Sequence, residues 1–232
     1  MRWGIPVKPN RLLSTKTRPT SDRGEVTRQR LLEVAIRVFA ARGFDGARTR
    51  DIAEAAKTNI VSIAYYFGSK QGLYDAAALH VAARWTAHEG PLIQQARTSM
   101  SRPKITHPEL VGILCTMLGD FLRFLLGHSL PDYYGRFVSQ AASGSPRAFR
   151  LLNRGLAPLR NTLAEAIARL TGKSATSLDI QVRALTIIGT CVYFRRDRSA
   201  VLHALKWKQI GPMEIKMIEK VIRANIQAMF SR

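Results

Sequence analysis

Two short helix signals separated by a tight turn constrain this chain more than any other feature of its sequence. Residues 49–56 read Thr-Arg-Asp-Ile-Ala-Glu-Ala-Ala, so a threonine is expected to cap a helix whose small side chains let a second helix cross closely. Residues 57–58 form the turn, and Asn59 is expected to cap a second helix that Gly68 ends after an aromatic run. This arrangement predicts a helix-turn-helix.

A longer helix is expected before this unit. From Thr27, its expected N-cap, the apolar side chains of residues 31–39 recur at helical spacing and form one broad stripe. Gly43 stands where a left-handed C-cap is needed, and Phe44 can pack back on the end of the helix. The sequence therefore predicts a compact three-helix domain over residues 25–72.

The first residues of the chain differ from the rest in composition. Residues 1–24 contain scattered proline, serine, threonine and basic residues with little apolar periodicity, which predicts a disordered basic arm. The arm either reaches DNA or is a solvated tail, and the sequence leaves both open. Its basic side chains are Lys8, Arg11, Lys16 and Arg18 among others.

Residues 73–232 predict a larger C-terminal helical domain. Apolar helical stripes alternate there with proline, glycine and serine, and no strand alternation appears. Pro158 is expected to kink one helix, and the run 195–198 can interrupt another. The whole chain is therefore predicted to be all-α. The segments expected beyond residue 90 are 91–100, 108–127, 131–143, 146–171, 176–204 and 212–230.

The helix-turn-helix segment strongly resembles the TetR family of transcriptional regulators. The family frame is Thr-x-x-x-Ile-Ala, a turn, a helix, and Tyr-x-Phe-x-Ser-Lys, and here it reads Thr49, Ile52, Ala53, Tyr65, Phe67, Ser69 and Lys70. Residues 59–74 look most like the CecR-type branch, which residues 132–134 and 207–211 also fit. Lys57 replaces the usual turn glycine and Ala64 a frequent tyrosine, so no base preference is carried over.

The resemblance implies a homodimer that binds double-stranded operator DNA and is released by a small-molecule effector. A helix N-terminus reaches base edges in the major groove, so Ile60 and Val61 are expected near thymine methyls. The resemblance implies phosphate contacts for Thr49, Tyr65, Tyr66 and Lys70. The alternative is structural: caps at Thr49 and Asn59, and a core ring at Tyr65. The expected DNA-binding set is Arg48, Thr49, Lys57, Asn59, Ile60, Val61, Ser62, Tyr65, Tyr66 and Lys70.

The resemblance also implies an effector pocket among the helices spanning about 91–194, where aromatic side chains can line a cavity or simply form core. The candidates are Met117, Phe121, Phe124, Tyr133, Tyr134, Phe137 and Tyr193. Dimerisation is implied through a four-helix bundle of 146–171 with 176–194 or 212–230. The candidates there are Leu152, Leu156, Leu159, Leu163, Ile167 and Leu170, a stripe wide enough for core and interface together.

The net charge of +20 favours a polyanionic partner. Residues 1–90 contain 15 basic and 8 acidic residues, whereas residues 91–232 contain 21 basic and 8 acidic residues. The larger excess of positive charge therefore lies outside the helix-turn-helix. This surplus suggests an anionic effector or, alternatively, a solvated surface. Cys115 and Cys191 lie in apolar helical contexts and are expected to be core thiols in a reducing, cytoplasmic setting. No membrane span or signal peptide is expected.

Two other function classes are alternatives to a transcriptional regulator. An enzyme is not expected, because no hydrolase or nucleotide-binding motif appears, and neither a cofactor nor a metal is expected. The histidines, which lack metal-ligand spacing, are His80, His88, His107, His128 and His203. A basic nucleic-acid-binding or nucleoid-organising protein without ligand sensing is the second alternative. It lacks an aromatic stacking platform, and the helix-turn-helix favours duplex DNA.

Overall fold

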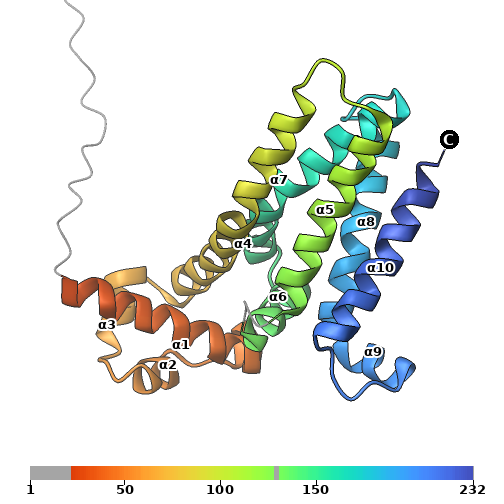
Figure 1. Ribbon diagram of the computed structural model, residues 1–232. Helices are drawn as coiled ribbons and strands as arrows, with labels where there is room; N and C mark the ends of the chain where they lie inside the picture. The colour runs from red at the N-terminus through yellow and green to blue at the C-terminus, as the bar shows by residue number, and fades with distance from the viewer. Residues whose placement is uncertain (1–21, 128–130, 232) are drawn as a thin grey trace, which may run out of the picture.

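The computed structural model describes residues 22–127 and 131–231, which form ten α-helices and contain no strand (Figure 1). This confirms the all-α prediction. The arm expected over residues 1–24 falls almost entirely outside the described residues, as do Lys8, Arg11, Lys16 and Arg18. Within the described part of the chain, no helix is both long enough and apolar enough to cross a membrane.

Three helices form the N-terminal part: α1 (Asp22–Gly46), α2 (Thr49–Ala55) and α3 (Val61–Phe67). Helix α1 begins before Thr27, so the cap expected there is wrong and Thr27 lies inside the helix. Gly43 interrupts α1 with φ 69°, a backbone conformation that glycine adopts without steric cost. The kink turns Phe44 back so that its ring lies 5.0 Å from that of Tyr74.

Seven further helices follow: α4 (Lys70–Met100), α5 (His107–Leu126), α6 (Asp132–Gly144), α7 (Pro146–Thr171), α8 (Leu178–Arg196), α9 (Arg198–Leu205) and α10 (Pro212–Met229). Helix α4 runs through Pro91 without a break, so the separate segment expected at 91–100 is wrong. Helix α7 likewise continues through Pro158. The interruption expected at 195–198 is confirmed, because α8 ends at Arg196 and α9 begins at Arg198.

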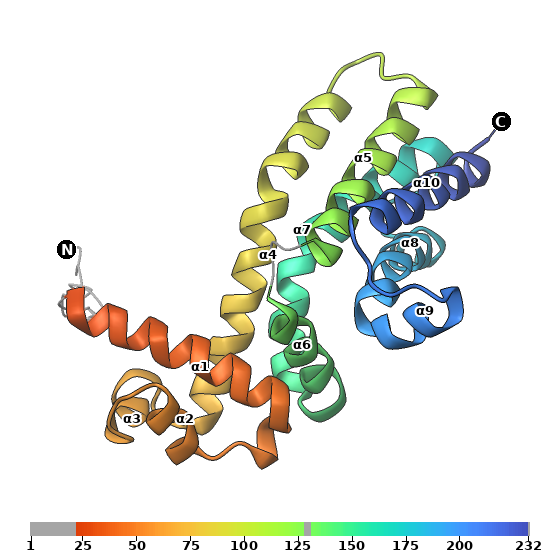
Figure 2. The ribbon, with the colours of Figure 1, turned by 60° about the horizontal axis from the view of Figure 1, so that its bottom comes forward.

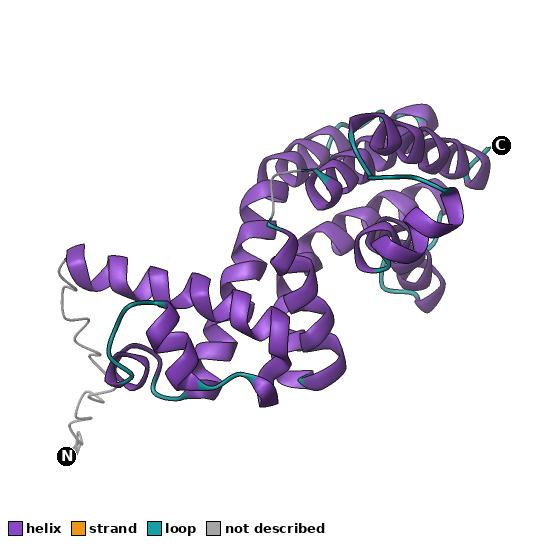
Figure 3. Ribbon diagram, turned by 90° about the horizontal axis from the view of Figure 1, so that it is seen from below, coloured by secondary structure: helices purple, strands orange, loops and turns teal. Residues whose placement is uncertain are grey.

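Two hydrophobic cores occupy the two ends of the molecule. The first joins α1–α3 to the start of α4 and to α6, with Phe39, Tyr74 and Phe137 at its centre. The second joins α5 and α8–α10 to the rest of α4 and α7, and it contains both cysteines, which are buried and unpaired as expected. Helix α4 contributes to both cores and runs between them (Figure 2). Seen from below, the N-terminal and C-terminal helices lie at opposite ends (Figure 3).

Candidate nucleic-acid interface and apolar cavity

The start of α3 presents apolar side chains to solvent. Ile60, Val61 and Tyr65 are 46%, 65% and 69% exposed, whereas Ile63 on the opposite side of the helix is 3% exposed and packs in the first core. Exposed branched apolar residues beside a tyrosine are unusual for a solvated helix face and typical of a contact surface. Helix α3 packs against the start of α4 and lies at the outer edge of the molecule, away from α5, α7, α8, α9 and α10 (Figure 2).

Local hydrogen bonds shape the turn that leads into α3. The N-cap position of α3 is Ile60, so the cap expected at Asn59 is wrong by one residue. Asn59 still satisfies a backbone donor at the start of the helix, because the Val61 N–H donates to Asn59 Oδ1 over 2.9 Å. The hydroxyls of Thr58 and Ser62 are 3.0 Å apart and share a hydrogen bond. Lys57, which stands in place of the usual glycine, adopts the left-handed conformation with φ 50°.

The turn from α3 to α4 is equally constrained. Ser69 caps α4 by accepting a hydrogen bond of 3.0 Å from the Gly72 N–H. A Cβ atom at residue 72 would lie 2.0 Å from the Phe67 carbonyl oxygen, so the turn requires glycine. Lys70 lies with its ammonium 4.6 Å from the centre of the Phe44 ring, which holds this charge beside the end of α1.

Most of the expected DNA-binding residues lie together around α2 and α3. Thr49 is the first residue of α2 and Arg48 occupies the N-cap position, so the cap expected at Thr49 is wrong by one residue. The exposed members of the set are Arg48, Lys57, Asn59, Ile60, Val61 and Tyr65, and the partly buried ones are Thr49, Ser62, Tyr66 and Lys70. An ion pair between Arg42 and Asp51 ties α1 to α2 and fixes this surface on the first core.

A cavity of about 290 Å³ lies among α4–α8. Its walls are mainly apolar and include two arginines, Arg195 and Arg196. The lining residues are Trp85, Phe121, Leu125, Tyr134, Gly135, Val138, Ser139, Ala142, Phe149, Leu152, Asn153, Leu156, Leu185, Ile188, Gly189, Val192, Arg195 and Arg196. A concave apolar site with a few polar groups is the usual form of a small-molecule pocket.

The cavity contains only two of the seven expected pocket residues, Phe121 and Tyr134. The other five line no part of this cavity, and the set expected to bind an effector stays a prediction. Tyr133 bonds to α1, Phe124 stacks on His88, Phe137 packs against Tyr74, Tyr193 is half-exposed, and Met117 is buried in the second core. Sequence reasoning missed the other lining residues because α4, α6, α7 and α8 meet only in the folded chain.

Tyr134 connects the cavity wall to α1. Its hydroxyl donates to Glu33 Oε1 over 2.8 Å, and the neighbouring Tyr133 hydroxyl donates to Glu33 Oε2 over 3.0 Å. His80 Nε2 lies 3.2 Å from the Tyr134 hydroxyl and 3.3 Å from Glu33 Oε1. Burial and the Glu33 carboxylate raise the pKa of Tyr134, so its hydroxyl stays protonated and donates.

Arg195 is the more buried of the two arginines that line the cavity. Its side chain is only 10% exposed and is held by Asp132 Oδ1 and the Pro131 carbonyl oxygen, each at 3.2 Å. A Cβ atom at residue 135 would lie 2.7 Å from Arg195 Nε, so Gly135 makes room for it. Burial lowers the pKa of Arg195, partly offset by Asp132; arginine nonetheless remains charged in proteins.

Comparison with known proteins identifies the family. Residues 31–77 match the model for bacterial regulatory proteins of the tetR family, and residues 110–231 match the C-terminal domain of the HTH-type transcriptional dual regulator CecR. The chain belongs to the TetR family, in its CecR-like branch. It is therefore a DNA-binding transcriptional regulator.

Relatives and solved structures agree with this assignment. The TetR-family chain is 24% identical to CecR from Shigella flexneri over 88% of its own length and 91% of that protein. It is 32% identical to the repressor NicS from Pseudomonas putida, over 44% of this chain and 52% of NicS. A Rhodococcus regulator shares the fold with a TM-score of 0.60 at 16% identity, covering 87% of this chain and 96% of its own. FadR from Bacillus subtilis, solved with stearoyl-CoA, has a TM-score of 0.56 at 15% identity. The match covers 86% of this chain and 97% of FadR.

The leucine stripe expected at a dimer interface lies mainly in the interior of this TetR-family chain. Leu156 is half-buried, and the other five side chains are no more than 7% exposed, which leaves little of them for a partner to cover. Apolar side chains that do face solvent gather on two other helices. They are Leu178, Val182, Leu185 and Tyr193 on α8, and Met213, Met217, Val221 and Met229 on α10.

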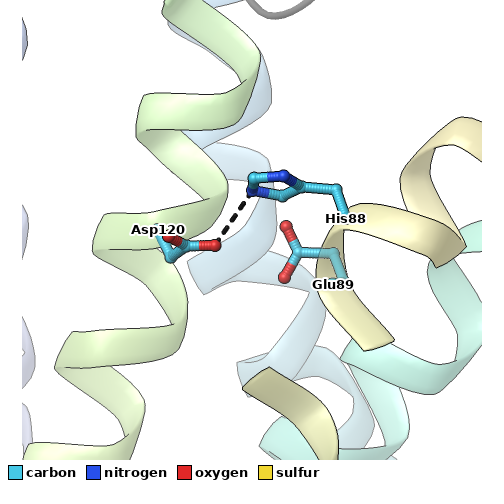
Figure 4. A group of neighbouring side chains, drawn as sticks. All are labelled: His88, Glu89 and Asp120. Carbon is cyan, nitrogen blue, oxygen red and sulfur yellow. Dashed lines mark hydrogen bonds and ion pairs between the residues drawn. The ribbon is translucent and has the colours of Figure 1, made fainter. Parts of the chain in front are cut away.

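The fold also brings together three polar side chains that the sequence did not connect. His88 and Glu89 on α4 meet Asp120 on α5, with one ligand atom of each within 4.8 Å of the others (Figure 4). His88 Nε2 lies 3.0 Å from Asp120 Oδ2. Burial, with a smaller contribution from Asp120, raises the pKa of Glu89 to about 8. No spacing rule along one helix could reveal this cluster, because it depends on the crossing of α4 and α5.

Proposed function

We propose that this TetR-family regulator is a homodimeric repressor that leaves a palindromic operator when a small molecule fills the cavity among α4–α8. The observation that carries the proposal is the double role of Tyr134. Its ring lines the cavity, and its hydroxyl bonds to Glu33 of α1, which packs on the helix-turn-helix. A ligand that moves the ring changes this bond. We take α1 to have two arrangements, one with this bond intact and one with it altered. The ligand shifts the equilibrium toward the arrangement that it binds more tightly, and the size of the shift depends on the difference between its two affinities.

The DNA-binding side of the proposal rests on α3. The exposed Ile60 and Val61 stand at the N-terminal end of α3, where a helix in the major groove reaches base edges and thymine methyl groups. Tyr65 and the flanking Lys57 and Lys70 are then placed beside phosphates. Such contacts fix orientation without reading the sequence.

The homodimer is supported by the apolar faces of α8 and α10. Residues 178, 182, 185 and 193 share the side of α8 opposite the one that packs in the second core. Residues 213, 217 and 221 form a similar stripe on α10. Two such faces, repeated by a two-fold axis, can form a four-helix interface and present two copies of α3 to successive half-sites.

The lining of the cavity favours an effector with an apolar body and an acidic group. The walls suit the apolar part, and Arg195 and Arg196 can pair with a carboxylate or phosphate. The stearoyl-CoA bound to Bacillus subtilis FadR has this chemistry. Calorimetry with a fatty acid and the alcohol of the same chain length tests the idea. We expect tighter binding of the acid, and binding of the alcohol alone would end it.

Selection of bound duplexes from a random pool, followed by footprinting, tests the function as a whole. We expect a palindromic site with half-sites about one helical turn apart. Alanine at Ile60, Val61 or Tyr65 is expected to weaken retention of that site, whereas Leu205→Ala on α9 serves as an exposed apolar control. Equal retention of all duplexes would instead favour a non-sensing, nucleoid-organising protein.

A further inference from the structure

We propose that His88, Glu89 and Asp120 bind a divalent transition-metal ion of the zinc class, which fastens α4 to α5. An imidazole with two carboxylates is a ligand set that such ions accept, and zinc is commonly held by three protein groups with a further position left open. The three side chains converge from two helices (Figure 4).

Glu89 provides the observation that points to a ligand. The residue is 1% exposed, and neither of its carboxylate oxygens has a hydrogen-bond partner among the described residues. A buried carboxylate without partners is strongly disfavoured, and such groups normally pair with a cation or coordinate a metal. In Figure 4 this carboxylate points toward the space between His88 and Asp120.

The geometry of the cluster suits one shared ion. Ligand atoms about 2.1 Å from a tetrahedral ion lie about 3.4 Å from each other. The observed atoms lie within 4.8 Å of one another, and His88 Nε2 is 3.0 Å from Asp120 Oδ2, so small side-chain rotations admit the ion.

Neighbouring groups hold two of the proposed ligands in place. The His88 imidazole stacks on the Phe124 ring with centres 4.0 Å apart and planes 13° from parallel. Asp120 Oδ1 lies 3.5 Å from Arg123, which leaves its other oxygen for the ion. Such outer contacts orient metal ligands and tune their affinity.

Solvent can reach the site, and an ion can bind there by displacing the Glu89 proton. The His88 and Asp120 side chains are 34% and 31% exposed, so an ion can enter without unfolding the helices. Arg123, which also pairs with Asp120, bonds to Glu219 over 2.7 Å and so does not neutralise Glu89. A bound ion would cross-link the helix that leads from α3 to the rest of the molecule.

Titration of the chelator-treated full-length protein with zinc chloride, followed by calorimetry, tests the proposal. We expect the wild type to bind one equivalent per protomer and to gain thermal stability. Glu89→Gln, which keeps the shape of the side chain but cannot become a carboxylate ligand, is expected to lose at least tenfold in zinc affinity. His203→Ala, which removes an exposed histidine on α9, is the matched control and should retain the site.

Three results would overturn the proposal of a zinc-class site. Failure of the wild type to bind zinc, binding of magnesium in its place, or equal zinc affinity in Glu89→Gln overturns the proposal. If Glu89→Gln does not fold, Asp120→Asn gives the same comparison from the solvent-exposed side of the cluster. All these measurements are made without DNA, so they do not depend on the proposed repressor function.

Discussion

Gly155 allows α7 to approach α4 more closely than any residue with a side chain could. A Cβ atom there would lie 2.7 Å from the Ala82 carbonyl oxygen and 2.9 Å from Ala82 Cα and Cβ. We therefore expect Gly155→Ala to lower the free energy of unfolding by about 1–3 kcal/mol, because α4 and α7 must move apart. Denaturant unfolding measures the change.

The matched control is Gly112→Ala in α5, where a Cβ atom meets nothing within 4 Å. That change should be neutral or stabilising by up to about 1 kcal/mol, since alanine favours helix. Equal effects of the two substitutions would show that the contact with Ala82 carries no strain.

Roles that depend on residues close in the sequence could be predicted from the sequence. Asn59 accepts from a backbone N–H at the start of α3, Gly43 takes a positive φ and Ser69 caps α4, because each depends on backbone groups only a few positions away. Tyr134 and Glu33 could not be paired in this way. They are 101 positions apart, and their contact depends on how α6 packs against α1.

Between elements, the bond from α6 to α1 can be tested with two tyrosines that share one acceptor. Tyr134→Phe removes a hydroxyl from the cavity wall, and Tyr133→Phe removes one that bonds to Glu33 from outside the cavity. Each change should lower the free energy of unfolding by about 1.5 kcal/mol, because Glu33 loses a donor. We expect only Tyr134→Phe to reduce the effect of a fatty-acid probe on operator affinity. Equal responses of both variants would contradict a role for Tyr134 in signalling.

Element boundaries were predictable where the sequence carries a strong signal. Helix α7 was expected at 146–171 and lies there, because Ser145 caps its start, proline follows, and Gly172 ends it in the left-handed conformation. The proline inside α4 misled the prediction. Helix α4 continues through Pro91, since packing of its flanking turns against both cores outweighs one lost backbone hydrogen bond.

The two lysines beside α3 and α4 give a prediction about salt. If Lys57 and Lys70 contact phosphates, Lys57→Ala and Lys70→Ala should each lower the affinity for all duplexes to a similar degree, whatever their base sequence. Each should also reduce the slope of log affinity against log salt by about one. Lys173→Ala, at the far end of the molecule where Lys173 pairs with Asp179, should leave the slope unchanged. A change in base preference without a change in slope would contradict phosphate contact.

At the scale of the whole molecule, the two hydrophobic cores support different surfaces at the two ends. The first core supports α3, the second core leaves apolar faces on α8 and α10 exposed, and α4 contributes to both. The basic excess follows the same division. Part of it surrounds α2 and α3, and Arg195 and Arg196 place another part at the cavity. Net charge alone could not separate these contributions, because a total carries no information on position.

Dimerisation is the property that the whole-molecule arrangement makes most directly testable. Val182 is 60% exposed on the outer face of α8, so Val182→Glu should leave the protomer folded. In a two-fold interface it would place a carboxylate against the partner's apolar face and beside its own copy, which disfavours association. We expect sedimentation to show monomers and operator affinity to fall by roughly a hundredfold or more, because one half-site remains. Leu205→Glu, an equally drastic change at a 47% exposed site on α9, is expected to stay dimeric; a dimeric Val182→Glu would place the interface elsewhere.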